Sequence, residues 1–404
     1  MFHAYRQLFA APGTASFVLA GLIARLPLSM TGIGLITMLS QQRGAYTLAG
    51  AVAACFALSI AVLAPRISAL VDRHGQRKVL PVAAATSASA MFALLACAHW
   101  QGPDWLLLLL AALVGSLPSM PAMVRARWTV LYRGTPQLQT AYAFEAVLDD
   151  LCFIIGPPLS VGLSMVLFPE AGPMAAALLL LAGVTLFVLQ RRTEPPVTPH
   201  DQQARQRSLV RHQPVVRSLA LFMLAQGIIV GTIDVAAVAF ATQHGQPAMA
   251  SVVLSFYALG SCVMGLVFGA LRLQMPLHRQ IVWVGASVAI TAVPLLLASN
   301  LTALTLAVLL AGITFGPTIT VAMGLVEQQV AASRLTEGMT WLLTGLAMGV
   351  ALGAAAAGWV TDHLGPQMSF VVALVAGAAM WAWGAQAGRL ARHEAPAEHA
   401  ACTG

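Results

Sequence analysis

Apolar stretches of about 20 residues recur along nearly the whole chain, and they constrain its fold more than any other feature. A helix needs about 20 apolar residues to cross the hydrocarbon core of a bilayer, where it satisfies its own backbone hydrogen bonds. Hydrophobic residues make up 59% of the 404-residue chain and charged residues only 9%. A water-soluble fold cannot bury that much apolar surface. The sequence therefore predicts an all-α integral membrane protein with no separate soluble domain.

The apolar stretches predict twelve membrane-spanning helices, six on each side of a polar segment near the middle of the chain. Six-helix bundles are expected over residues 1–190 and 218–387, with a cytoplasmic linker at 191–217 and a cytoplasmic tail at 388–404. The predicted spans are 14–40, 46–66, 78–98, 104–124, 144–168, 172–190, 218–241, 250–272, 280–298, 301–325, 337–360 and 367–387.

The positions of the positive charges support this arrangement. With a cytoplasmic amino terminus, only Arg43 of the 21 Lys and Arg residues faces outward, and only Arg25 lies within a span. Lys and Arg are enriched in cytoplasmic loops of membrane proteins. The distribution therefore predicts an even number of spans in a cell membrane, with both termini cytoplasmic. It also explains the net charge of +7 without a nucleic-acid partner.

A compact polar turn over residues 68–80 joins the second and third predicted spans. It contains Asp72, Arg73, Gly75 and Arg77. Glycine allows the positive φ that a tight turn requires. A carboxylate at the end of a helix is unfavourable unless a cation or another helix N-terminus meets it, so Asp72 is expected to make a specific contact.

This turn resembles the signature loop of the major facilitator superfamily of transporters, Gly-x-Leu-Ala-Asp-Arg-x-Gly-Arg-Arg/Lys, which joins helices 2 and 3. Ser68 replaces the first glycine of the pattern and Gln76 replaces an arginine. The resemblance implies two pseudo-symmetric six-helix bundles around a central cavity, with alternating access. It also implies a conformational gate formed by Asp72, Arg73, Gly75 and Arg77.

Two further arginines, Arg125 and Arg127, follow the fourth predicted span and are candidates for the same gate. The preferred interpretation of both is solvated positive charge at the cytoplasmic end of the helix. The alternative is that they pair with Asp72 or with acids of the fifth span.

Three acids, Glu145, Asp149 and Asp150, fall in the first two turns predicted for the fifth span. The helix dipole favours negative charge at that end. Asp149 lies one turn after Glu145 on the same face. Asp150 points about 100° away from Asp149, so a different partner is expected for it.

Gly-Pro pairs occur within two predicted spans. Gly156-Pro157 resembles the Gly-Pro motif in helix 5 of drug/proton antiporters of the superfamily, which favours export. Gly316-Pro317 lies in the tenth span. Because proline removes a backbone hydrogen bond, both pairs are expected to break their helices.

Two charged residues lie deep within predicted spans. Arg25 is about eleven residues into the first span, and Asp234 lies past the middle of the seventh. Charged groups at such depth are costly and usually functional. Asp234 is the main candidate for binding a proton or substrate, with Arg25 and Gln226 in the same cavity and Asp149 and Asp150 as second-line candidates. A structural ion pair between Arg25 and Asp234 is the alternative.

These features favour a secondary active transporter that couples efflux of a small amphipathic or drug-like molecule to protons. The alternatives are proton-coupled uptake of an organic acid or sugar, and a membrane sensor or scaffold built on a transporter fold. The sequence contains no recognisable nucleotide-binding loop, catalytic triad spacing or metal cluster, so no enzymatic activity and no cofactor besides the proton are expected. The expected partners are the substrate and the bilayer, and the expected state is a monomer.

Overall fold

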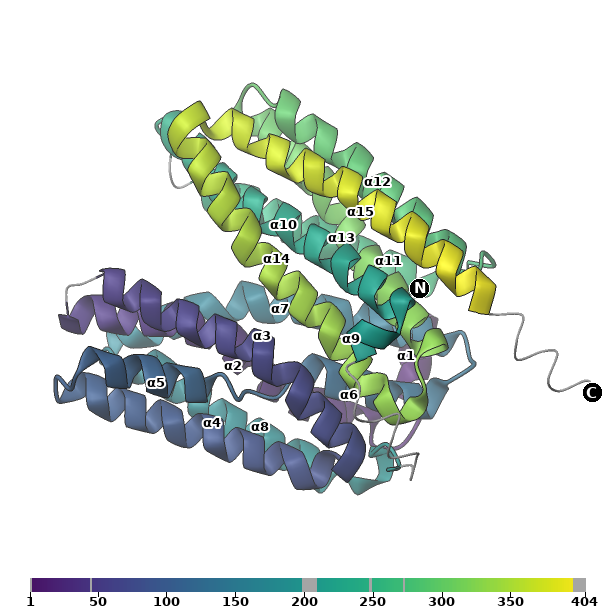
Figure 1. The fold of residues 1–404 in the computed structure, drawn as a ribbon, viewed down its shortest axis with the longest axis horizontal. Coiled ribbons are helices and arrows are strands. Elements are labelled where there is room, and N and C mark those ends of the chain that lie inside the picture. Colours follow the sequence, from purple (N-terminus) through teal and green to yellow (C-terminus); the bar gives the residue numbers. More distant parts are fainter. Residues whose placement is uncertain (1, 44–45, 198–208, 247–248, 272, 395–404) are drawn as a thin grey trace, which may run out of the picture. The chain divides into compact units, whose positions relative to one another are not determined.

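The computed structural model describes residues 2–43, 46–197, 209–246, 249–271 and 273–394, and every regular element within these ranges is a helix (Figure 1). The helices of the first half are α1 (Phe2–Leu8), α2 (Thr14–Arg43), α3 (Tyr46–His74), α4 (Gln76–His99), α5 (Asp104–Val114), α6 (Met120–Tyr132), α7 (Gln137–Val166), α8 (Ala171–Leu189) and η1 (Arg191–Thr193). Those of the second half are α9 (Leu209–His212), α10 (Pro214–Gln243), α11 (Met249–Ala270), α12 (Leu277–Leu297), α13 (Leu301–Gln329), η3 (Ala332–Arg334), α14 (Leu335–Leu364) and α15 (Pro366–Glu394). The prediction of an all-α fold is confirmed.

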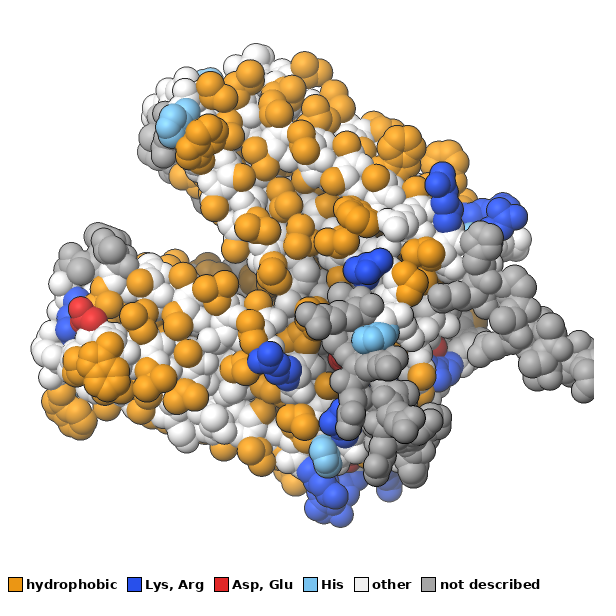
Figure 2. All heavy atoms as spheres, in the orientation of Figure 1, with side chains coloured by type: hydrophobic (Ala, Val, Ile, Leu, Met, Phe, Trp, Pro, Cys, Tyr) orange, Lys and Arg blue, Asp and Glu red, His pale blue; other side chains and the backbone are white. Residues whose placement is uncertain are grey.

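Eleven helices in the described part of the chain are long and apolar enough to cross a membrane, and α5 is a shorter apolar helix. Figure 2 shows hydrophobic side chains over the sides of these helices, with Lys and Arg concentrated toward helix ends. This is the surface expected of helices whose sides face lipid.

The chain divides into two compact units by its internal contacts. The amino-terminal unit comprises Arg6–Arg133 and Leu148–Pro199, and the carboxy-terminal unit comprises Met1–Tyr5, Gly134–Val147 and His200–Gly404. The predicted boundaries at 190 and 218 remain a prediction. Residues 198–208 of the predicted linker and 395–404 of the predicted tail lie outside the described residues.

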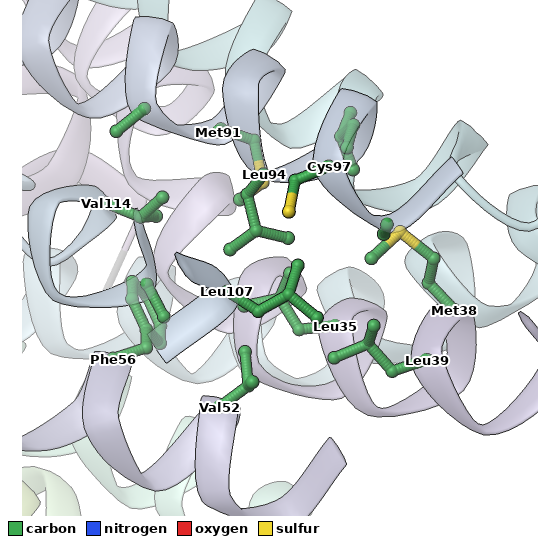
Figure 3. Close-up of a cluster of buried hydrophobic side chains, with 14 of the residues drawn as sticks. Leu35, Met38, Leu39, Val52, Phe56, Met91, Leu94, Cys97, Leu107 and Val114 are labelled. Atoms are coloured by element: carbon green, nitrogen blue, oxygen red, sulfur yellow. The ribbon is translucent and has the colours of Figure 1, made fainter. Parts of the chain in front are cut away.

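A dry apolar cluster holds the helices of the amino-terminal unit together. Leu35 and Met38 of α2, Val52 of α3, Leu94 of α4 and Leu107 of α5 all point into it (Figure 3). Each of these side chains is almost fully buried. Branched and flexible apolar side chains pack densely without polar atoms, which is how neighbouring helices are held where no polar contact is available.

The carboxy-terminal unit contains a seam of glycines between α10 and α14. Gly345, Gly349 and Gly353 of α14 lie against backbone atoms of α10, and Gly227 and Gly231 of α10 lie against α14. A Cβ on any of them would overlap backbone of the facing helix. The spacing of small residues therefore produces the close helix contact that it predicts.

The fourth predicted span, 104–124, is interrupted. It forms the two helices α5 and α6, with residues 115–119 between them. Pro118 lacks a backbone N–H, and Gly115 allows close contact with α3, where a Cβ would overlap Ser59. Ser87 donates a hydrogen bond to the Val114 carbonyl at 2.7 Å, which supplies one partner lost at the interruption.

The expected breaks at the Gly-Pro pairs are absent. The helices α7 and α13 continue through Gly156-Pro157 and Gly316-Pro317. A proline can be accommodated within a membrane helix because neighbouring groups satisfy the carbonyls that it frees. The glycines instead permit close packing: Gly316 lies against the backbone of Gly265.

Candidate functional site

One charged cluster of the amino-terminal unit consists of two buried arginines and one carboxylate. Nη1 of Arg25 donates to Oδ1 of Asp149 at 2.8 Å, and Nη2 of Arg125 donates to Oδ2 at 2.6 Å. Arg25 is 3% exposed and Arg125 is fully buried. Nε and Nη1 of Arg125 are also buried and have no hydrogen-bond partner among the described residues. The Asp149 carboxylate therefore contacts two buried cations, and Arg125 retains free donors.

The position of Asp149 within its helix corrects one expectation. Because α7 begins at Gln137 and not near 144, the acids lie beyond its first two turns. The dipole at a helix N-terminus fades within the first turn. Direct pairing with Arg25 and Arg125, and not the helix dipole, therefore stabilises Asp149 at this depth.

A close approach of α2 to α7 brings the cluster together. A Cβ on Gly156 would overlap the hydroxyl of Ser29, so a larger residue there would displace that hydroxyl. The Ser29 hydroxyl lies 2.8 Å from the Cys152 carbonyl, to which it can donate a hydrogen bond. Gly156 thus has a packing role one turn beyond Cys152, on the segment that carries Asp149.

The other arginine of α6, Arg127, is fully buried in a separate network. Its Nε donates to Oε1 of Gln76 at 2.8 Å, and its Nη atoms donate to the carbonyls of Phe187 and Gln190 and to the Thr193 hydroxyl. The guanidinium carbon lies 3.7 Å from the centroid of the Phe187 ring. Cation–π contact and hydrogen bonds together compensate for the loss of water around the charge.

The preferred interpretation of these two arginines as solvated surface charge is therefore wrong. Arg125 has the partner that the alternative named, an acid of the next span, and Arg127 has a glutamine and helix-end carbonyls. Charge bias alone predicts exposure, but each guanidinium here has specific buried acceptors.

The signature turn adopts the expected backbone. Gly75, between α3 and α4, has a φ of 89°. The Arg77 N–H, in the first turn of α4, donates to Oε1 of Glu194 at 2.8 Å, which places a carboxylate at this helix N-terminus. Asp72 is half-buried, whereas the side chains of Arg73 and Arg77 are exposed.

The candidates on α10 separate into buried and exposed groups. Asp234 is exposed, and no hydrogen bond or ion pair to its carboxylate occurs among the described residues. Gln226 and Thr232 are buried, and the Thr232 hydroxyl donates to the Ile228 carbonyl. A cavity shared by Gln226 and Asp234 stays a prediction.

A second polar cluster lies where α7 meets α8. Oε1 of Glu170 accepts from Nε2 of Gln42 at 2.6 Å and lies 2.9 Å from Nδ1 of His99. Burial raises the pKa of Glu170, but hydrogen bonds from His99, its own backbone N–H and Gln42 outweigh burial and hold the pKa below its ordinary value.

Sequence reasoning missed the residues that hold Arg127, namely Gln76, Phe187, Thr193 and Glu194 close by. The glutamine at position 76, where the signature pattern has an arginine, was one signal in the sequence that pointed to a special role for this side chain. Asp150 is half-buried beside the paired Asp149, and its role stays a prediction.

Solved structures of transporters share this fold. The chain superposes on the human organic anion transporter TETRAN with a TM-score of 0.73 at 15% identity, covering 92% of this chain and 98% of that one. A bacterial homologue of the iron transporter ferroportin, in an outward-facing state, superposes with a TM-score of 0.75 at 14% identity, covering 93% of this chain and 99% of that one. The E. coli fucose:proton symporter superposes with a TM-score of 0.69 at 13% identity, covering 92% of this chain and 99% of that one. At these identities the likeness concerns the fold.

Sequence comparison identifies the family directly. No curated protein sequence matches the chain closely enough to count as a relative. The sequence pattern of the Major Facilitator Superfamily, however, matches residues 17–309 and 218–401, which together cover nearly the whole chain. The signature turn, the apolar helices and this match agree, and the chain belongs to the Major Facilitator Superfamily of membrane transporters.

Proposed function

We propose that this transporter exports a small amphipathic or drug-like molecule in exchange for protons, by alternating access of its two halves. The observation that carries the proposal is Asp234, a carboxylate within the membrane-spanning helix α10. It is exposed and has no partner among the described residues. A carboxylate at that depth is stable when it binds a proton or a cationic substrate, which is the exchange that a coupled transporter needs.

The amino-terminal cluster has a different role in this proposal. Asp149 already accepts hydrogen bonds from both Arg25 and Arg125. It therefore positions the two arginines, while Asp234 carries the proton. The signature turn and Arg127 control the conformational change and do not touch substrate.

The proposed direction of transport and the proposed location of the protein are based on features of the sequence. Gly156-Pro157 and its likeness to the motif of drug/proton antiporters support export. The charge distribution supports a location in the cell membrane with both termini cytoplasmic. A monomer is the default for this architecture. The protein would have no cofactor and no enzymatic activity. That one structural neighbour is a fucose:proton symporter supports the proton as coupling ion.

A second candidate function is proton-coupled uptake of an organic acid or sugar. It is favoured by Arg125, whose Nε and Nη1 are buried without a partner. A guanidinium with free donors suits a carboxylate, to which it can donate charge-assisted hydrogen bonds. One structural neighbour is an organic anion transporter.

The test is proton flux in proteoliposomes on addition of candidate compounds, comparing wild type with Asp234→Asn. The control is Asp104→Asn, an acid outside the long apolar helices and 62% exposed. We expect coupled proton flux in wild type and control, and its loss in Asp234→Asn. Coupling that survives in Asp234→Asn would contradict the role of Asp234.

Cell phenotypes separate the candidate functions. A deletion strain that becomes sensitive to toxic compounds supports export, whereas failure to grow on an organic acid or sugar supports uptake. A sensor or scaffold built on the same fold predicts that Asp234→Asn leaves the cellular phenotype unchanged.

A further inference from the structure

A pocket of about 540 Å³ lies at the end of α8 in the amino-terminal unit. It is formed where the start of α2 meets the end of α8 and the short helix η1. Its lining residues are Gly13, Ser16, Leu186, Leu189, Gln190, Arg191, Arg192 and Thr193.

The pocket has one apolar and one cationic wall. Leu186 and Leu189 are 47% and 66% exposed on α8, a helix apolar enough to cross the membrane. Such exposed leucines face hydrocarbon. Arg191 and Arg192 follow immediately, at the depth where the span ends and lipid headgroups begin.

The two arginines are available to a ligand. Both side chains are exposed, and neither makes a hydrogen bond or ion pair with the described part of the chain. The acid that follows them, Glu194, accepts a hydrogen bond from the Arg77 backbone N–H. Two adjacent guanidinium groups beside an apolar wall are thus suited to bind an anion with an apolar tail.

We propose that this pocket binds the phosphate headgroup of an anionic phospholipid. Guanidinium groups bind phosphate oxygens through paired, charge-assisted hydrogen bonds, so Arg191 and Arg192 would hold the phosphate. The first acyl carbons would lie against Leu186 and Leu189. Basic pockets beside membrane helices are suited to such headgroups.

The pocket shares a wall with the Arg127 network. The Thr193 hydroxyl and the Gln190 carbonyl, both in lining residues, accept hydrogen bonds from Nη1 of Arg127. A bound lipid would stabilise η1 in this conformation and thereby keep the acceptors of Arg127 in place. The site thus links the surrounding lipid to the helix that carries Arg125 and Arg127.

Native mass spectrometry of the full-length protein tests the proposal, with phosphatidylglycerol and phosphatidylcholine of identical acyl chains as probes. The charge variant is Arg191→Gln/Arg192→Gln. The matched control is Arg389→Gln/Arg392→Gln, another pair of exposed arginines at the end of a membrane-spanning helix. Ser16→Phe fills the pocket without changing charge. Thermal unfolding of each variant verifies that it is folded.

We expect wild type and the control to retain one phosphatidylglycerol in preference to phosphatidylcholine. At the strength typical of basic residues near an anionic membrane, the charge variant should bind it about thirtyfold more weakly. Ser16→Phe should also lose the preference. Equal binding by wild type and both pocket variants would overturn the proposal. An equal loss in the Arg389→Gln/Arg392→Gln control would show general charge attraction and also overturn it. Displacement of the lipid by millimolar glycerol phosphate would assign the site to a soluble phosphate instead.

Discussion

Nε of Arg127 lies 2.8 Å from Oε1 of Gln76, and both side chains are buried. Gln76 also donates to the Met123 carbonyl at 3.0 Å, so its amide uses both its acceptor and a donor. The superfamily pattern has an arginine at this position. An arginine here would place a second buried cation beside Arg127, and the neutral amide avoids that repulsion.

Replacing Gln76 should therefore destabilise the amino-terminal unit. Gln76→Leu leaves Nε of Arg127 without its acceptor, a loss of about 1.5–3 kcal/mol for a hydrogen bond to a charged group. Gln76→Arg, which restores the superfamily pattern, should destabilise further. The measurement is the apparent melting temperature of the purified protein. The exposed neighbour Arg77→Gln serves as control and should melt like wild type; equal melting of all four proteins would show that the amide contributes nothing.

Asp149→Asn should be far more damaging than the same change at a surface pair. It removes the charged partner that Arg25 and Arg125 share, a loss of about 3–5 kcal/mol. The comparison is Asp104→Asn, which breaks an exposed pair with Arg43 and should cost less than about 1 kcal/mol. Chemical unfolding of both variants in detergent measures the difference. Similar stabilities would mean that the buried cluster does not depend on its carboxylate.

The glycine seam predicts opposite effects for two substitutions on α14. In Gly349→Ala the new Cβ would overlap the Leu224 carbonyl, and overpacking should cost about 1–3 kcal/mol. At Gly358 a Cβ meets nothing within 4 Å. Gly358→Ala should be neutral or stabilising by up to about 1 kcal/mol, since alanine favours helix. Thermal unfolding of the pair checks this, and a stable Gly349→Ala variant would show that the helices can separate slightly at no cost.

Glu170 predicts a dependence of stability on pH. Its pKa is held below the ordinary 4.5, so its ionised form is favoured in the folded protein. The stability that the ionised Glu170 contributes is fully present above about pH 4.5, the pKa of this group in the unfolded chain. That stability is lost as the pH falls through the lower pKa of the folded protein. The difference in melting temperature between wild type and Glu170→Gln should shrink as the pH falls below about 4.5. A difference that grows on acidification would have the wrong sign.

The features that sequence predicted well are local or periodic. The apolar stretches define the membrane helices, the positive φ of Gly75 follows from a tight turn, and the spacing of Gly345, Gly349 and Gly353 yields a close helix contact. Each depends on residues within a few turns of one another, so it can be inferred without knowing which helices are neighbours.

The pairing of buried charges could not be predicted in the same way. Arg25 and Asp149 are 124 residues apart, and their contact depends on which faces of α2 and α7 meet. The start of α7 was misplaced because its first turns contain Gln137, Gln139 and Thr140, which lack the apolar character of a span. Polar first turns hide the beginning of a membrane helix from any argument based on hydropathy.

Arg125 and Arg127 are two residues apart on α6, so their side chains leave the helix in directions about 200° apart. Arg125 donates to Asp149 of α7, whereas Arg127 donates to Gln76 of α4 and lies over the ring of Phe187 of α8. One turn of α6 therefore connects two buried networks on opposite sides of the helix. We expect a movement of the signature turn, where Gln76 begins α4, to displace Asp149 through this helix.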